Sequence, residues 1–121
     1  MRLIAALLLT AATVTTAHAK GDLFIYTWGE YTPTDLVAKF EKEFVVKVHI
    51  DNYDSMETMI SKLRADGAGY DLIVPGDATM QVLIAEGVVE KIEHNAMPNY
   101  ANVDDRWKDV YWDPKRAYSA P

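Results

Sequence analysis

Two short segments of the chain carry side chains that could hold a ligand. In the first, Trp28 and Tyr31 place aromatic rings on either side of the Glu30 carboxylate. In the second, Gly76 and Asp77 place a carboxylate directly after an apolar run that ends in proline. Aromatic faces beside carboxylates attract ammonium groups through cation–π contact and ion pairing. These residues therefore predict the binding of a small organic cation.

Each segment also has a purely structural interpretation. Trp28 and Tyr31 could simply cover the end of a hydrophobic core, with Gly29 allowing the sharp turn between them. Asp77 could cap the helix that follows it by accepting backbone N–H groups. Capping and ligand contact are compatible, so the two interpretations of Asp77 stay open together.

Composition and motif spacing argue against several other functions. The 121 residues include 18 acidic and 12 basic side chains, with a formal net charge of −6 and no basic cluster. A nucleic-acid partner is therefore not expected, because phosphate backbones are bound through lysine and arginine. There is no cysteine, which excludes thiolate metal sites and cysteine nucleophiles. No metal, cofactor or catalytic residue is predicted, and the protein is not expected to be an enzyme.

The first nineteen residues have the layout of a secretory signal. Arg2 precedes an apolar run over residues 3–12, and the segment closes with Ala17-His18-Ala19. A basic start, an apolar stretch and a small-x-small site are the three parts of a cleavable signal peptide. We expect cleavage after Ala19 and export to the periplasm, with residues 20–121 as the mature part.

The mature part alternates strand-like and helix-like patterns. The first apolar run predicts a strand buried on both faces, and a capping box at Asp54–Glu57 and an αL glycine at Gly87 mark helix ends. The expected elements are a strand at 23–28, a helix from about 33 to 44, a strand at 45–50, a helix from about 56, a strand at 71–74 and a helix at 77–86. This order predicts a mostly parallel sheet with helices on its faces. Because such sheets bind ligands beyond the carboxyl ends of their strands, both candidate segments should lie at one edge.

Several spaced motifs together resemble one family. They are LFIYTWGEY at 23–31, YDSMETM at 53–59, GYDLIVP at 69–75 and YSAP at 118–121. This set is similar to the spermidine/putrescine-binding periplasmic proteins, the solute-binding components of polyamine ABC importers. The resemblance covers essentially the whole mature chain.

The resemblance implies a fold and a set of partners. The family has two α/β lobes that close on the ligand, so residues 20–121 would be an incomplete, three-layer, parallel-sheet part of lobe 1, with the second lobe absent. Trp28 and Tyr31 would lie against a polyamine, Glu30 would be a further contact, and the loop at Gly76 and Asp77 would also reach the ligand. The implied protein is a monomer that delivers putrescine or spermidine to a membrane permease and performs no chemistry.

Three departures from the family pattern weaken that implication. Ala78 stands where an aromatic side chain is expected, which removes one wall of the usual site. Val45 stands where the family has a glycine, so the end of the first helix should be strained or re-routed. The chain is also much shorter than family members. The alternatives are a truncated, non-binding remnant or a binder of a different small solute.

Overall fold

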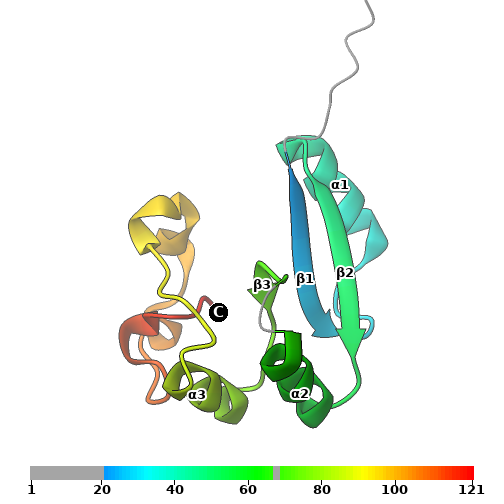
Figure 1. The fold of residues 1–121 in the computed structure, drawn as a ribbon. Helices are drawn as coiled ribbons and strands as arrows, with labels where there is room; N and C mark the ends of the chain where they lie inside the picture. Colours follow the sequence, from blue (N-terminus) through cyan, green and yellow to red (C-terminus); the bar gives the residue numbers. More distant parts are fainter. Residues whose placement is uncertain (1–20, 67–68) are drawn as a thin grey trace, which may run out of the picture.

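The computed structural model describes residues 21–66 and 69–121, so the expected signal segment lies outside the described residues. Three strands alternate with three α-helices along the chain (Figure 1). Their bounds are β1 Asp22–Trp28, α1 Thr34–Phe44, β2 Lys47–Tyr53, α2 Met56–Asp66, β3 Leu72–Ile73 and α3 Asp77–Ala85. Short 3-10 helices follow at His94–Ala96, Pro98–Asn102, Asp105–Trp107 and Pro114–Arg116. The predicted α/β order is confirmed.

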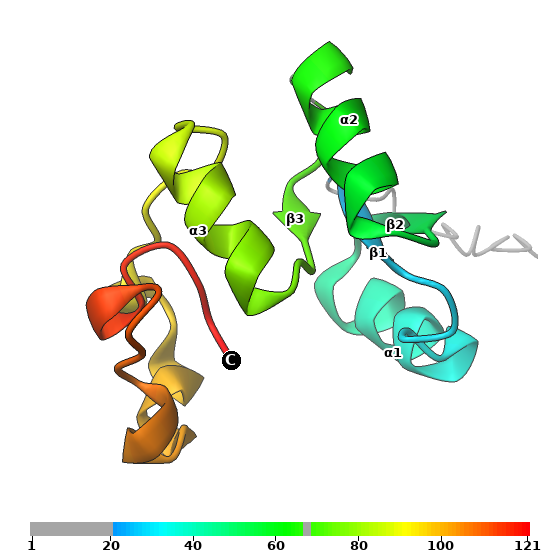
Figure 2. The same ribbon diagram turned by 90° about the horizontal axis from the view of Figure 1, so that it is seen from below.

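The strands form one parallel sheet in the order β2-β1-β3. The register pairs Trp28 with Tyr53 at the carboxyl ends of β1 and β2. Because β2 and β3 lie on opposite sides of β1, right-handed crossovers place α1 and α2 on opposite faces. Figure 2 shows this arrangement, with the sheet between the two helices. The predicted three-layer parallel architecture is therefore present.

The two faces of the sheet carry different side chains, because alternate residues of a strand point to opposite sides. The face beneath α2, here called the aromatic face, carries Phe24, Tyr26, Trp28, His49, Asp51 and Tyr53. The face beneath α1, here called the aliphatic face, carries Leu23, Ile25, Val48, Ile50 and Leu72.

The hydrophobic core lies on the aromatic face and extends to α3. Its buried members are Tyr26, Tyr53, Met59 of α2 and Leu83 of α3. Burial of β1 on both faces, as the sequence predicted, is wrong for its first half. Phe24 is 40% exposed there, because the core beneath α2 includes only the carboxyl-terminal half of the strand.

The second and third predicted strands are displaced at both ends. The third was expected at 71–74, whereas β3 spans only Leu72–Ile73. The second strand was expected at 45–50, but β2 begins at Lys47 and continues to Tyr53. Val45 instead closes α1 in the left-handed region, with φ 56° and ψ 45°. Of the two outcomes expected there, the structure has the strained turn, because a β-branched residue occupies a conformation that suits glycine.

One of the two predicted helix caps is displaced by one residue, and the other is where the sequence predicts it. The α2 cap is Ser55, whose hydroxyl accepts the Thr58 N–H at 3.1 Å, so the box proposed at Asp54–Glu57 is wrong in its position. Gly87 does take φ 67° after α3. Its N–H donates to the Ile84 carbonyl at 3.1 Å, and the Val88 N–H donates to the Leu83 carbonyl at 3.0 Å. The predicted glycine cap is confirmed.

The segment after α3 is organised by polar groups, because its buried side chains are Asp113 and Arg116. Asp113 is 1% exposed and accepts hydrogen bonds from the Ser119 hydroxyl at 2.7 Å and from the Tyr118 N–H. Arg116 is 5% exposed and donates from Nε to the Trp107 carbonyl at 2.7 Å.

Among residues 21–66 and 69–121, no helix has the length and apolar character needed to cross a membrane.

Candidate functional site

Three aromatic side chains gather at the carboxyl edge of the sheet. The Trp28 ring lies 4.6 Å from the Tyr53 ring, centroid to centroid, with 54° between their planes. The Tyr31 ring lies 6.5 Å from the Trp28 ring. We call Trp28, Tyr31 and Tyr53 the aromatic ledge. It stands where an open parallel sheet normally receives its ligand.

The turn after β1 presents Tyr31 to solvent. The Tyr31 N–H donates to the Trp28 carbonyl at 3.4 Å, and the Tyr31 side chain is 69% exposed. The left-handed residue of this turn is Glu30, with φ 62°. The sequence had assigned the sharp turn to Gly29, so that interpretation is wrong by one residue. Glu30 is exposed beside the ledge.

Tyr53 holds the ledge against the core. It is 4% exposed, and its hydroxyl donates to the Val74 carbonyl beyond β3. Burial, followed by the neighbouring Tyr26 and Tyr31, raises the pKa of Tyr53 to about 12. The hydroxyl therefore stays protonated and keeps its hydrogen bond at any ordinary pH.

Tyr53 was not among the site residues that the sequence suggested. The sequence pattern predicts that the second strand ends at Ile50, and it therefore places Tyr53 outside the strand, in the motif at 53–59. With β2 extended to Tyr53, the residue becomes the register partner of Trp28. A strand boundary placed three residues later would have brought it to the same edge as Trp28.

The second predicted segment starts α3. Gly76 is the N-cap in an extended conformation, with no side-chain cap, and Asp77 is the first helical residue. The Asp77 carboxylate accepts the Ala78 N–H at 2.8 Å, so Asp77 does bond the helix start but is not its cap. Gly76, Asp77 and Ala78 are all exposed.

The two predicted segments are linked through the backbone. Val74 accepts the Tyr53 hydrogen bond and also donates its N–H to the Tyr26 carbonyl at 3.0 Å. Within the described part of the chain, no hydrogen bond or ion pair joins Asp77 to the aromatic ledge. The structure thus groups Trp28 and Tyr31 with Tyr53, and it places Asp77 three residues beyond the atom that Tyr53 binds.

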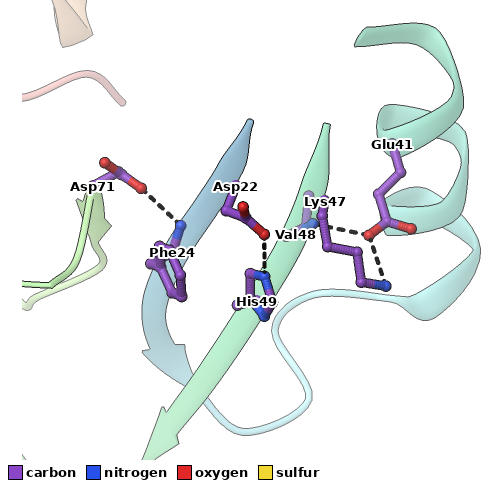
Figure 3. Close-up of polar contacts among 7 residues, drawn as sticks. All are labelled: Asp22, Phe24, Glu41, Lys47, Val48, His49 and Asp71. Carbon is purple, nitrogen blue, oxygen red and sulfur yellow. Dashed lines mark hydrogen bonds and ion pairs between the residues drawn. The ribbon is translucent and has the colours of Figure 1, made fainter. Parts of the chain in front are cut away.

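At the amino ends of the strands, opposite the aromatic ledge, polar side chains make contacts that stabilise the fold (Figure 3). There His49 bonds Asp22 at 2.7 Å and stacks on Phe24 with centroids 4.6 Å apart. Glu41 of α1 accepts the Val48 N–H at 2.8 Å, and that bond, ahead of the nearby Lys47, lowers the pKa of the Glu41 carboxyl. These groups lie at the amino ends of the strands, away from the aromatic ledge.

Known proteins resemble the chain in both sequence and structure. It is 38% identical over 109 residues to the spermidine/putrescine-binding periplasmic protein of Salmonella typhimurium, covering 87% of this chain and 31% of the relative. It is 35% identical over 102 residues to the putrescine-binding periplasmic protein PotF of Escherichia coli, covering 84% of this chain and 28% of the relative. The resemblance to polyamine-binding periplasmic proteins is confirmed. No protein-family model matches the chain.

Solved structures agree with the sequence relatives. The TpPotD lipoprotein of Treponema pallidum has a TM-score of 0.72 and 36% identity, covering 78% of this chain and 30% of that one. The spermidine/putrescine ABC transporter substrate-binding protein PotD of Streptococcus pneumoniae has a TM-score of 0.80 and 25% identity, covering 84% and 31%. The fold is thus that of part of such a binding protein. The chain spans about 30% of the length of the curated relatives that it matches.

Proposed function

We propose that this chain provides the ligand-binding edge of a polyamine ABC importer's substrate-binding component. It binds a putrescine-like or spermidine-like cation and delivers it to a membrane permease without chemistry. The observation that supports this most directly is the aromatic ledge. Tyr31 is open to solvent beside Trp28, and Trp28 is backed by the buried Tyr53. A fixed aromatic surface with one open side is suited to alkylammonium chains.

Each proposed contact has a distinct role. The Trp28 and Tyr31 rings lie against the methylenes and ammonium groups of the ligand. The carboxylates of Glu30 and Asp77 pair with ammonium charge, and both are exposed. At Gly76 a Cβ atom would meet nothing within 4 Å, so the backbone there is open to a ligand.

A second candidate is a remnant that no longer binds polyamines, or a binder of another small solute. Ala78 favours this alternative, since its methyl group is exposed where the resemblance implies an aromatic wall. A ledge with one wall missing would hold its ligand more weakly and would discriminate less between chain lengths.

Isothermal titration with putrescine and spermidine separates these candidates. Saturable heat with a one-to-one stoichiometry is expected if the ledge is a working site. An absence of heat across the millimolar range would favour the remnant.

Two exposed tyrosines provide a matched pair for locating the site. Tyr31→Ala should weaken putrescine binding about 10-fold, the usual scale of one cation–π contact with its ring. Tyr111 is 82% exposed and lies outside the ledge, so Tyr111→Ala should leave binding unchanged. Equal putrescine affinities for the two variants would show that Tyr31 does not contact the ligand.

We also propose that the protein is exported with cleavage after Ala19 and that it is a monomer. We further propose that binding involves a second lobe, which is not formed by residues 20–121. The signal pattern and the periplasmic names of the relatives support the first proposal, and the greater length of the relatives supports the last. N-terminal sequencing of the secreted protein should begin at Lys20. Light scattering should give the mass of one chain.

A further inference from the structure

A second arrangement suited to a cation lies on the aromatic face, and the chain fills it with its own lysine. Tyr26 of β1 stacks on Tyr70, with centroids 4.6 Å apart and 9° between the ring planes. The Lys62 ammonium of α2 lies 5.0 Å from the Tyr26 centroid and 5.1 Å from the Tyr70 centroid. Both distances are within the range of cation–π attraction. Because the two rings are nearly parallel and stacked, the ammonium can lie over the face of only one of them and is beside the edge of the other.

Asp51 supplies the carboxylate of this arrangement. Its Oδ2 atom accepts a hydrogen bond from Lys62 Nζ at 3.1 Å and another from the Tyr70 hydroxyl at 2.5 Å. The Tyr70 hydrogen bond, followed by Lys62, lowers the pKa of the Asp51 carboxyl, so Asp51 is ionised at neutral pH. We call Tyr26, Tyr70 and Asp51 the tyrosine cage.

The core holds part of the cage in place independently of Lys62. Tyr26 is 2% exposed and packs edge-on against Tyr53, with centroids 5.0 Å apart. Asp51 is the β2 register partner of Tyr26, so the sheet fixes their spacing. Tyr26 and Asp51 should therefore keep their positions when the lysine side chain is removed.

The cage is also reachable from solvent. The Lys62 side chain is 39% exposed and the Asp51 side chain 56% exposed. An ammonium group from solution can approach along the direction now occupied by the lysine stem.

We propose that the tyrosine cage is a binding site for a primary alkylammonium group, which Lys62 occupies from within the chain and which an external amine can occupy in its place. One aromatic face, the edge of the ring stacked on it and one carboxylate oxygen meet at the position of a single ammonium. The cage shares no residue with the aromatic ledge, although Tyr26 packs against Tyr53 of the ledge, and the inference does not depend on the proposed transport function.

Chemical rescue tests the proposal. Lys62→Ala removes the side chain beyond Cβ, and n-propylammonium has the shape and charge of the removed part. We expect the variant to lose about 4–8 °C in Tm. n-Propylammonium, at concentrations on the order of tens of millimolar, should restore at least half of this loss in a saturable way. If the variant is unfolded by itself, the same comparison is read as recovery of the helical circular dichroism signal.

Controls distinguish cage binding from general salt effects. Tetramethylammonium and n-propanol lack either N–H donors or charge and should not restore stability. Lys39 pairs only loosely with Asp35, at 3.9 Å on the surface of α1, so Lys39→Ala should be insensitive to the amine. Adding Asp51→Asn to Lys62→Ala should abolish the rescue. Rescue that survives Asp51→Asn, or that tetramethylammonium reproduces, would overturn the proposal.

The rescue can also be made covalent. Because the chain has no cysteine, a single introduced cysteine is the only thiol that an alkylating reagent can modify. In Lys62→Cys, the thiolate displaces bromide from 2-bromoethylamine and forms a thioether that ends in an ammonium group at the reach of lysine. Aminoethylation should return Tm close to the wild-type value, and carboxamidomethylation should not. Equal recovery with both reagents would show that the cage does not select an ammonium.

Discussion

The two faces of the sheet are built from the same three strands but are packed very differently. On the aromatic face, Tyr26, Tyr53 and Met59 are each 4% exposed or less. On the aliphatic face, α1 buries none of its residues. A hollow of about 200 Å³ remains between that helix and the sheet, lined by Leu23, Ile25, Thr32, Leu36, Val37, Phe40, Val48 and Leu72.

This difference shows which part of the fold positions the candidate site. Tyrosine side chains are held in place by directional hydrogen bonds. The Tyr53 hydroxyl donates to the Val74 carbonyl, and the Tyr70 hydroxyl donates to Asp51. Aliphatic side chains have no such directional contacts and depend on close packing alone. The ledge and the tyrosine cage are both on the well-packed face, so their geometry should tolerate changes beneath α1.

The largest expected effect compares one buried and one exposed side chain on the two faces. Met59 is fully buried on α2, whereas Leu36 of α1 is 56% exposed. Met59→Ala should lower the free energy of unfolding by about 2–5 kcal/mol through loss of burial and creation of a cavity. Leu36→Ala should cost less than about 1 kcal/mol. Urea denaturation measures both values, and equal losses would show that the faces are equally packed.

The join between α1 and β2 adds strain to the loosely packed layer. Val45 holds φ 56°, a conformation that costs a residue with a Cβ atom about 1–2 kcal/mol. Val45→Gly removes this cost, but glycine also gives the unfolded chain greater conformational entropy, which offsets part of the gain in stability. Val45→Gly should therefore stabilise the protein by about 0.5–1 kcal/mol. Val45→Ala retains Cβ and serves as the control. A melting temperature for Val45→Gly at or below the wild-type value would refute the strain.

Filling the hollow should stabilise the aliphatic face. Val37 lines it from α1, and Val37→Leu adds one methylene worth about 0.8 kcal/mol if it is buried there. Met59→Phe enlarges a buried side chain on the closely packed aromatic face, so it should instead lower the free energy of unfolding by about 1–3 kcal/mol. Thermal melts of the two variants should therefore shift in opposite directions, and a shift in the same direction would contradict the packing contrast.

The smallest expected effect is the pH dependence of the tyrosine cage. The pKa of Asp51 is lowered from its ordinary value of 3.8 by the Tyr70 and Lys62 hydrogen bonds. A lowered pKa in the folded state means that this contribution is present above the ordinary value and is lost as the pH falls through the folded one. The pKa of Lys62 is raised from 10.5, so the lysine contribution is lost only above that pH.

Comparison of the wild-type protein with Asp51→Asn measures this contribution. The urea midpoint of the variant should be lower at pH 7, and the difference should disappear at the acid end of the titration. The effect should be modest, because both side chains are partly solvated. A constant difference at every pH would mean that the charge of Asp51 is not responsible.

The local patterns in the sequence predicted the elements of this fold well. Short apolar runs and helix-start residues identified all three strands and helices, and the glycine cap at Gly87 was correct. Boundaries were less accurate, because the extent of a strand depends on pairing with a neighbour. Val45-Val46 has strong strand character, yet Val45 takes a left-handed conformation that closes α1. The same boundary error hid Tyr53 from the candidate site.

The sequence by itself determined the order of elements, the parallel sheet, the family resemblance and the presence of Trp28 and Tyr31 at a strand end. These features depend on the types and spacing of residues that are close together in the chain. Only the tertiary structure decided that Tyr53 backs Trp28 and that Lys62 fills the cage of Tyr26, Tyr70 and Asp51. Such contacts join residues on different strands and helices, so they depend on strand order, register and the face that each helix covers.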